Sequence, residues 1–137
     1  MNVLLTGGAG YIGSHAAIEL IEHGHDICIV DNLANSSLTA IQRIESLTNT
    51  TVDFHQIDLL DATRVDQLFD KRQIDVVMHF AGSKVVAESV SHPLEYYRNN
   101  IGGTINLCSA MATHQMKNLV FSSSASVYGE PKSLPID

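Results

Sequence analysis

The sequence predicts an α/β domain in which a doubly wound parallel sheet of five strands is covered by helices on both faces. Five short apolar segments alternate with stretches that have helical spacing, which gives the order βαβαβαβαβ. These segments are almost continuously apolar, as expected of parallel strands that are buried on both faces. Right-handed crossover connections then leave few possible topologies.

Each predicted element is bounded by turn-forming or helix-capping residues. The strands are expected at Val3–Leu5, at Ile27–Val30, in the alternating Val52, Phe54 and Ile57, at Val76–Met78 and at Leu119–Phe121. The helices are marked by the spacing of Ile12, Ala16 and Leu20, of Leu38, Ile41 and Ile44, of Val65, Leu68 and Phe69, and by a pattern from about Leu94 to Ala112. The capping residues are Gly24 after the first helix, Ser36 and Ser37 before the second, Asp61 before the third and Pro93 at the start of the fourth.

The fourth predicted helix contains two adjacent glycines, Gly102 and Gly103. Each glycine costs about 1 kcal/mol relative to alanine inside a helix, so their presence needs a reason. We therefore expect this helix to pack closely against a neighbouring segment at that point.

The composition indicates a packed domain and excludes several kinds of partner. The 137 residues fit one domain, and 45% hydrophobic with 17% charged residues favours a core over disorder. The chain has 15 acidic and 8 basic residues, a formal net charge of −7 and no basic stripe, so we expect no nucleic-acid partner. The first residues do not form a signal peptide, and no stretch approaches the roughly 20 apolar residues of a membrane span. We expect no membrane partner.

The two cysteines and seven histidines do not form a recognisable ligand motif. Cys28 and Cys108 are far apart, and neither belongs to a Cys-x-x-Cys motif. We expect reduced thiols in a cytoplasmic protein, each buried as a small hydrophobic residue. The histidines show no paired ligand spacing, so the sequence predicts no metal site.

A glycine-rich segment follows the first predicted strand directly. It matches Gly-x-x-Gly-x-x-Gly through Gly7, Gly10 and Gly13, and Gly-x-Gly-x-x-Gly through Gly8, Gly10 and Gly13. A dinucleotide needs a tight turn after the strand, a bare backbone for the pyrophosphate and a helix N-terminus to receive its charge. All three are predicted here, which indicates a Rossmann-type site.

The second predicted strand ends at Asp31, where a carboxylate can accept both hydroxyls of an adenosine ribose. The same carboxylate would repel the extra phosphate of NADP, and Asn32–Asn35 contains no arginine to offset it, so NAD is the expected cofactor. Asp58 and Leu59, after the third strand, are placed to meet the adenine, and Phe80–Gly82 to line the pyrophosphate side. The alternative is that the glycines form only a tight turn and that Asp31 merely ends a strand.

Five segments together resemble the UDP-glucose 4-epimerase family of extended short-chain dehydrogenases/reductases. They are T-G-G-A-G-Y-I-G-S-H at 6–15, D-N-L-A-N-S at 31–36, H-F-A-G-S-K at 79–84, P-L-E-Y-Y-R-N-N at 93–100 and F-S-S-S-A-S-V-Y-G at 121–129. The resemblance covers the whole chain but only the N-terminal part of that family's fold. It implies a tightly held NAD that removes hydride from C4 of a UDP-hexose and returns it to the other face of the 4-keto intermediate, in galactose metabolism.

The resemblance also implies a role for individual residues. By this resemblance, the residues that contact the pyrophosphate are Gly7, Gly10, Tyr11, Ile12 and Gly13, and those around the adenosine ribose are Asp31, Asn32, Asn35 and Ser36. Asp58 and Leu59 lie at the adenine. The residues along the rest of the cofactor are Phe80, Ala81, Gly82, Lys84 and Asn99, with Ser122 nearby. Ser124 matches the catalytic serine that hydrogen-bonds the sugar 4-hydroxyl. The segment around it favours an epimerase over the related dehydratases and decarboxylases.

The family's catalytic base is a tyrosine in Tyr-x-x-x-Lys, a spelling that Tyr128 and Lys132 share. The pair must lie on one helical face, however, and Gly129 and Pro131 disfavour a helix here. We predict that Tyr128 lies in a loop and is not the base. The chain then lacks the family's Tyr/Lys pair, its last strands and its substrate domain, and it resembles a truncated enzyme that is inactive alone.

Several expectations follow from this apparent truncation. The chain should expose apolar surface beside the last two strands and self-associate, either for that reason or because the family dimerises through helices on that side. The open alternative is a naturally short NAD-binding module without catalysis. Among single residues, His79 is expected to be a structural histidine, and Tyr96 and Tyr97 to pack within the fourth helix.

Overall fold

The computed structural model describes residues 1–133 and 135, and these residues form one parallel sheet of five strands. The strands are β1 (Asn2–Thr6), β2 (Asp26–Asp31), β3 (Asp53–Gln56), β4 (Val76–His79) and β5 (Leu119–Phe121). Their spatial order is β3-β2-β1-β4-β5. All five predicted strands are confirmed, as is the doubly wound topology. The strand order reverses beside β1, which is the place where open α/β sheets bind ligands.

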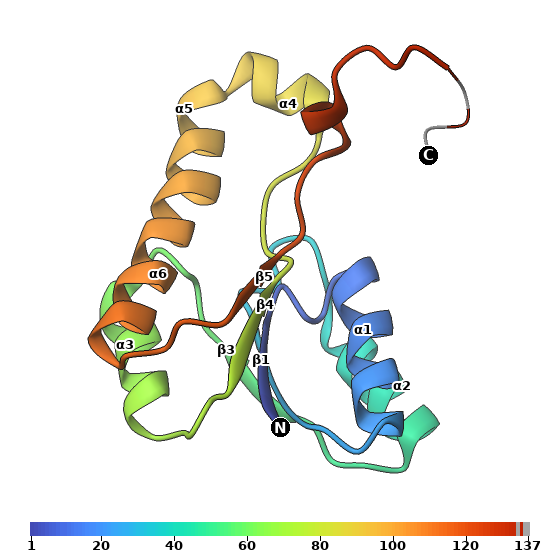
Figure 1. Cartoon of the computed structure of the whole chain (residues 1–137), viewed down its shortest axis with the longest axis vertical. Helices are drawn as coiled ribbons and strands as arrows, with labels where there is room; N and C mark the ends of the chain where they lie inside the picture. The colour runs from blue at the N-terminus through green and yellow to red at the C-terminus, as the bar shows by residue number, and fades with distance from the viewer. Residues whose placement is uncertain (134, 136–137) are drawn as a thin grey trace.

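Two layers of helices enclose the sheet (Figure 1). The helices α1 (Tyr11–Glu22) and α2 (Leu38–Thr48) cover one face, and α3 (Ala62–Asp70) and α6 (Gly103–Thr113) cover the other. Alternate residues of β1 point to opposite layers, because successive side chains of a strand alternate. Leu5 packs in the α1/α2 layer, and Leu4 in the α3/α6 layer.

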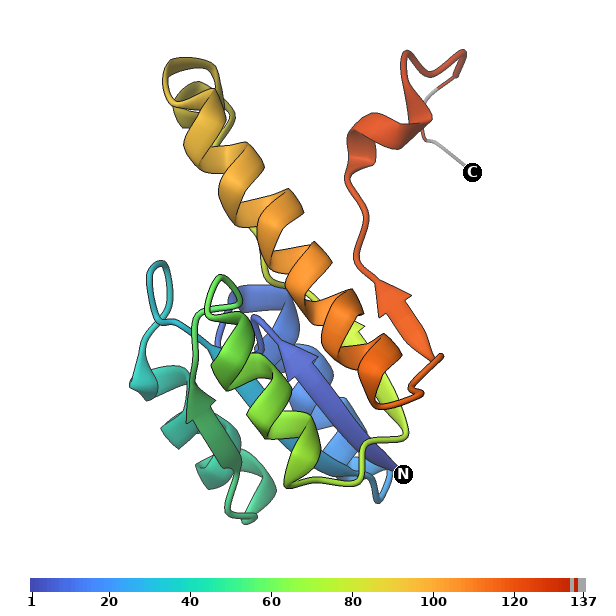
Figure 2. The ribbon, with the colours of Figure 1, turned by 90° about the vertical axis from the view of Figure 1, so that its left-hand side faces the viewer.

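Figure 2 shows the fourth predicted helix as one continuous rod, which has three parts and is not a single regular α-helix. It consists of α5 (Pro93–Tyr96), the π-helical turn η1 (Tyr97–Gly102) and α6. A short helix, α4 (Val86–Ser91), precedes the rod and was not predicted, because six residues are too few to show a helical period. After β5 the chain forms a 3₁₀ turn, η2 (Ala125–Tyr128).

The two glycines of the rod lie against the loop that follows β3. A β-carbon built on Gly103 would lie 3.1 Å from Leu59 Cβ, and one on Gly102 would lie 3.3 Å from Leu60 Cδ2. The close packing expected at these glycines is therefore confirmed, and it brings the start of α6 to the carboxyl end of β3.

The predicted capping residues lie at the helix ends except Ser36, which does not cap α2, and one of them makes the expected bond. Asp61 accepts a hydrogen bond from the Arg64 backbone N–H at 3.1 Å. Gly24 follows α1 with a φ of +76°, and Pro93 opens α5. Ser37 is the N-cap of α2, but its side chain makes no capping bond.

Apolar side chains are exposed along β5 and along the outer face of α4 and the rod. Those more than half exposed are Phe121, Val86, Val90, Leu94, Tyr97, Ile101 and Ile105. The expected exposed apolar surface is present. Two expectations are wrong: Tyr97 does not pack within its helix, since it is 62% exposed, and Cys108 is exposed whereas Cys28 is buried. No helix among the described residues has the length and apolar character needed to cross a membrane.

Candidate cofactor site

The loop between β1 and α1 has a shape that only glycine permits at two positions. Gly7 has a φ of +69°, and a β-carbon built on it would lie 2.6 Å from the Ala81 backbone nitrogen. A β-carbon on Gly13 would collide with the Gly7 carbonyl oxygen and lie 2.7 Å from Gly8 Cα. The loop is therefore folded tightly against the start of its own helix and against the β4 end.

The start of α1 is built to receive an anion. Its N-cap, Gly10, has no side chain to bond the first-turn N–H groups, which remain for a ligand together with the positive end of the helix dipole. Tyr11 and Ile12 occupy that first turn and are exposed. The glycine loop leaves its backbone bare, and the helix that follows it has free N–H groups. Together these two features fit the pyrophosphate of a dinucleotide.

Asp31 links the glycine loop to the loop after β2. Its Oδ2 accepts from the Ala9 N–H at 3.1 Å, and its Oδ1 accepts from the Leu33 N–H at 2.9 Å and from the Ser36 hydroxyl at 2.8 Å. A carboxylate has about four acceptor sites, so three internal bonds leave little capacity for ribose hydroxyls unless one of them gives way. Asp31 holds the two loops in register in addition to its predicted contact with a ribose.

The predicted adenine side is an open hollow beside β2 and β3. It is lined by Asn32, Ala34, Gln56, Asp58 and Arg64. Asn32 donates to Asp58 Oδ2 at 3.2 Å, and the Leu60 N–H donates to Asp58 Oδ1 at 2.8 Å. Arg64 was not predicted as a residue of this site. It lines the hollow because α3 starts beside the end of β3, where the Arg64 guanidinium donates to the Gln56 carbonyl at 2.9 Å.

Leu59 and Asn35 are not among the residues that line this hollow, but each is next in sequence to one that is. The Leu59 carbonyl accepts from Asn106 of α6 at 2.9 Å, so its backbone is fixed, and its side chain is partly buried. Asn35 is exposed in the loop between β2 and α2. Both therefore lie at the carboxyl edge of the sheet, as predicted.

The loop after β4 is held by asparagines of η1. The Ser83 N–H donates to Asn100 Oδ1 at 2.7 Å, and Asn100 Nδ2 donates back to the Ser83 carbonyl at 2.9 Å. The predicted Asn99 donates to the Ser83 hydroxyl at 3.0 Å. Phe80 and Ala81 lie against Gly7 of the glycine loop, Gly82 faces the Asn100 side chain, and Lys84 is exposed just beyond. Asn100 was missed because its role depends on a contact 17 positions away.

His79 is a structural residue, as predicted. It is 2% exposed, and its Nδ1 and Nε2 hydrogen-bond the hydroxyls of Thr6 and Thr104, the second at 3.0 Å. Burial lowers the pKa of His79 below its usual value of 6.5. The residue joins β1, β4 and α6 beneath the loops of the site.

Ser122 and Ser124 follow β5, at the same carboxyl edge. The Ser122 N–H donates to the His79 carbonyl at 3.1 Å. Ser124 is the N-cap of η2, and its hydroxyl accepts from the Ser126 N–H at 3.2 Å while its side chain stays exposed. Tyr128 lies in the 3₁₀ turn η2 and not in a loop, which corrects the prediction for this residue. Gly129 follows with a φ of +64°, and residues 129–132 form the expected loop, so no α-helix joins Tyr128 to Lys132.

The family is shown by comparison with known proteins. The model of the NAD dependent epimerase/dehydratase family matches residues 3–137. The chain belongs to this family. Among curated members, UDP-glucose 4-epimerase of Dictyostelium discoideum is 54% identical over 98% of the chain, and that of Bacillus subtilis is 51% identical over 99%. The chain spans about two-fifths of the length of these relatives, 39% and 40%.

Solved structures of family members have the same fold. UDP-glucose 4-epimerase from Bifidobacterium longum, in complex with NAD+ and UDP, has a TM-score of 0.95 and 47% identity over 99% of the chain. The enzyme from Stenotrophomonas maltophila, with bound NAD and formylated UDP-arabinopyranose, has a TM-score of 0.94 and 48% identity over 99%. The chain covers 41% and 40% of these two proteins. The predicted resemblance and the Rossmann-type fold are confirmed.

Proposed function

We propose that residues 1–137 form the NAD-binding domain of a UDP-glucose 4-epimerase. The observation that carries the proposal is the tight loop from Gly7 to Gly13, which ends in an uncapped helix and is tied to Asp31 at the switch point of the sheet. Family members with 47–48% identity and the same fold were crystallised with NAD. We also propose that the residues predicted above from the resemblance contact the pyrophosphate, the ribose and the adenine of NAD.

The proposed reaction is interconversion of UDP-hexoses at C4. Bound NAD would supply reversible hydride transfer at that carbon. Ser124 is exposed at the carboxyl edge, where its hydroxyl can hydrogen-bond the sugar 4-hydroxyl and assist departure of its proton. The loops after β1, β2, β3 and β4 would hold the cofactor, and the bonds of His79 to Thr6 and Thr104 would keep the loops after β1 and β4 rigid from below.

We further propose that the chain is inactive alone. The one Tyr-x-x-x-Lys of the sequence, at Tyr128 and Lys132, does not lie on an α-helix, so these side chains do not form the neighbouring pair that a tyrosine base requires. The same observation favours a second candidate, an NAD-binding module without catalysis. A related dehydratase or decarboxylase is a weaker alternative. A coding sequence that continues past residue 137 into a helical Tyr-x-x-x-Lys would favour the epimerase, and a stop codon would favour the module.

The proposed cofactor is tested by titrating the chain with NAD and with NADP. We expect tighter binding of NAD, and Asp31→Asn should weaken NAD binding at least tenfold and reduce the preference over NADP. Asp26→Asn is the matched control, because Asp26 lies exposed at the opposite end of the same strand. Equal binding of both nucleotides, or an equal effect of the two variants, would contradict the proposal.

We also propose that the chain forms a homodimer or self-associates, supported by the exposed apolar side chains of α4, the rod and β5. Sedimentation velocity across a range of concentrations tests this, and a monomer throughout would contradict it.

The free thiols Cys28 and Cys108 support a cytoplasmic location, which cell fractionation tests.

A further inference from the structure

Three metal-ligating side chains meet on β2 and β3, away from the proposed cofactor site. Among the residues that the structure describes, Cys28, Asp53 and His55 each offer one ligand atom, and these atoms lie within 4.8 Å of one another. Cys28 is the parallel partner of Asp53, and His55 is two residues further along β3 and so on the same face. The pairing of two strands therefore fixes the positions of all three donors.

The spacing of the donors is close to that of metal ligands. His55 Nε2 lies 3.1 Å from Asp53 Oδ1. In a tetrahedral site with metal–N and metal–O bonds of about 2.0–2.2 Å, two such ligand atoms are about 3.4 Å apart. The Cys28 sulfur lies within 4.8 Å of both of these ligand atoms. In a tetrahedral site a sulfur ligand and a nitrogen or oxygen ligand are about 3.6 Å apart, so shifts of about 1 Å would bring the three donors to one metal ion.

Arg72 holds the carboxylate in a suitable orientation. Its guanidinium forms an ion pair with Asp53 Oδ2, which leaves Oδ1 directed at His55. A partner of this kind outside the first ligand shell commonly fixes the direction of a metal-binding carboxylate. A Cys28 thiolate and the Asp53 carboxylate would supply two negative charges against the three positive charges of a divalent ion and Arg72, which leaves a net charge of +1 at the cluster.

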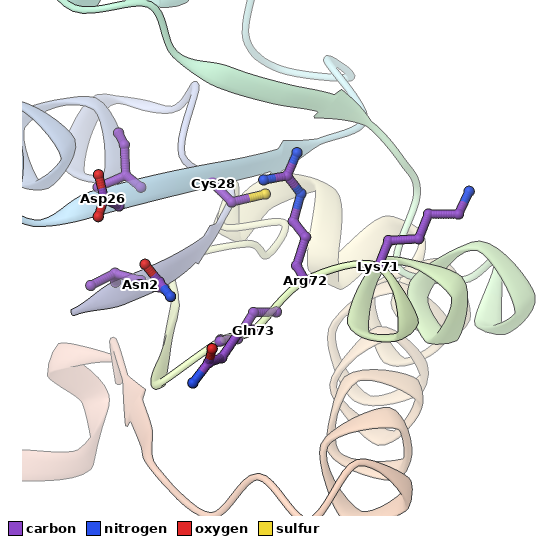
Figure 3. Close-up of a pocket in the computed structure, with 9 residues that line it drawn as sticks. Asn2, Asp26, Cys28, Lys71, Arg72 and Gln73 are labelled. Atoms are coloured by element: carbon purple, nitrogen blue, oxygen red, sulfur yellow. The ribbon is translucent and has the colours of Figure 1, made fainter.

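An ion and water can reach the cluster. A cavity of about 260 Å³ lies beside Cys28 and is lined also by Asn2, Lys71, Arg72 and Gln73. Figure 3 shows the Cys28 sulfur and the Arg72 guanidinium next to each other in this cavity. The side chains of His55 and Asp53 are 33% and 30% exposed, so the side of the cluster at the β3 edge is open to a water ligand.

We propose that Cys28, Asp53 and His55 bind a divalent transition metal such as Zn²⁺, with water as the fourth ligand. The Cys28 thiol releases its proton to solvent as the metal–sulfur bond forms, and His55 binds through Nε2 with its remaining proton on Nδ1. No redox step is involved. Thiolate and imidazole ligands favour Zn²⁺ and Co²⁺ over Mg²⁺ and Ca²⁺, so the latter two should not compete. The sequence predicted no metal because strand register, rather than a short motif, brings these residues together.

The test is titration of the full chain with Co²⁺ under reducing conditions. We expect one equivalent to bind, with a thiolate-to-cobalt charge-transfer band in the near ultraviolet that Zn²⁺ abolishes. Cys28→Ser should remove the band and weaken Co²⁺ binding at least tenfold. Cys108→Ser is the matched control, because Cys108 is an exposed free cysteine on α6 and should leave the band unchanged.

A second variant keeps the test decisive if Cys28→Ser does not fold. His55 lies partly exposed on the edge strand, so His55→Gln should fold, and Zn²⁺ should raise the thermal midpoint of the natural chain but not of this variant. His23→Gln, at an exposed histidine of α1's end, is its control. The proposal is overturned if no band forms, if the band depends on Cys108, or if Zn²⁺ stabilises His55→Gln as much as the natural chain.

Discussion

Substitution of Gly13 by alanine tests the shape of the loop that defines the proposed cofactor site. The added β-carbon would collide with the Gly7 carbonyl oxygen and lie 2.7 Å from Gly8 Cα. Both neighbours are backbone atoms, and the loop cannot move freely because the Gly7 N–H donates to the Val30 carbonyl at 2.8 Å. Forcing an extra methyl into a packed site costs about 1–3 kcal/mol.

Two measurements on Gly13→Ala follow from this clash. The thermal midpoint, followed by circular dichroism, should fall by roughly 3–5 °C for each kcal/mol in a chain of this length. NAD binding, followed by titration, should weaken at least tenfold, or about 1.4 kcal/mol, because the start of α1 is displaced.

Gly24→Ala is the matched control. Gly24 has a φ of +76° but no atom within 4 Å of a built β-carbon, so only the backbone cost of about 1 kcal/mol should appear. NAD binding should not change, because Gly24 lies at the far end of α1. If Gly13→Ala keeps the stability and the NAD affinity of the natural chain, the loop geometry described above is wrong.

Three further predictions concern stability and reactivity. Burial lowers the pKa of His79 in the folded state, so below the usual pKa of 6.5 the unfolded state binds more protons than the folded state. The free energy of unfolding should therefore fall as the pH drops below that value. His79→Gln should flatten this pH dependence in denaturant titrations. Asp61→Ala should cost about 0.5–2 kcal/mol of stability by loss of its capping bond, whereas Ser37→Ala, at a cap without a side-chain bond, should cost little; equal losses in urea unfolding would contradict the assignment. Cys108 should react quickly with a thiol reagent and Cys28 slowly, because burial and the nearby Asp53 raise the pKa of Cys28 to about 12; equal rates would refute this difference.

The sequence was sufficient where the signal is local. Strands such as β1 and β2 are short apolar runs between turn residues, and a glycine loop followed by Asp31 at the next strand end is a pattern within one βαβ unit. The Asp61 cap and the loop that follows Tyr128 also depend only on neighbouring residues. These features were predicted because their physical causes lie within a few positions or within one supersecondary unit.

The features that were missed depend on distant contacts. Thr6 and His79 are 73 positions apart, and parallel pairing of β1 with β4 brings them together. The two-way bond between Asn100 and Ser83 requires the rod to pass over the loop after β4. Exposure of Cys108 depends on which face of α6 meets the sheet. The spacing of the other residues in this helix did not show on which face Cys108 lies.

We propose above all that the carboxyl edge of this sheet holds NAD. The most direct measurement is the amount of NAD released when the purified chain is denatured, followed by titration of any empty fraction with NAD. We expect close to one NAD per chain, counting both fractions. Absence of NAD in the purified chain together with no binding on titration would contradict it, and would leave the loop from Gly7 to Gly13 without its proposed role in this chain.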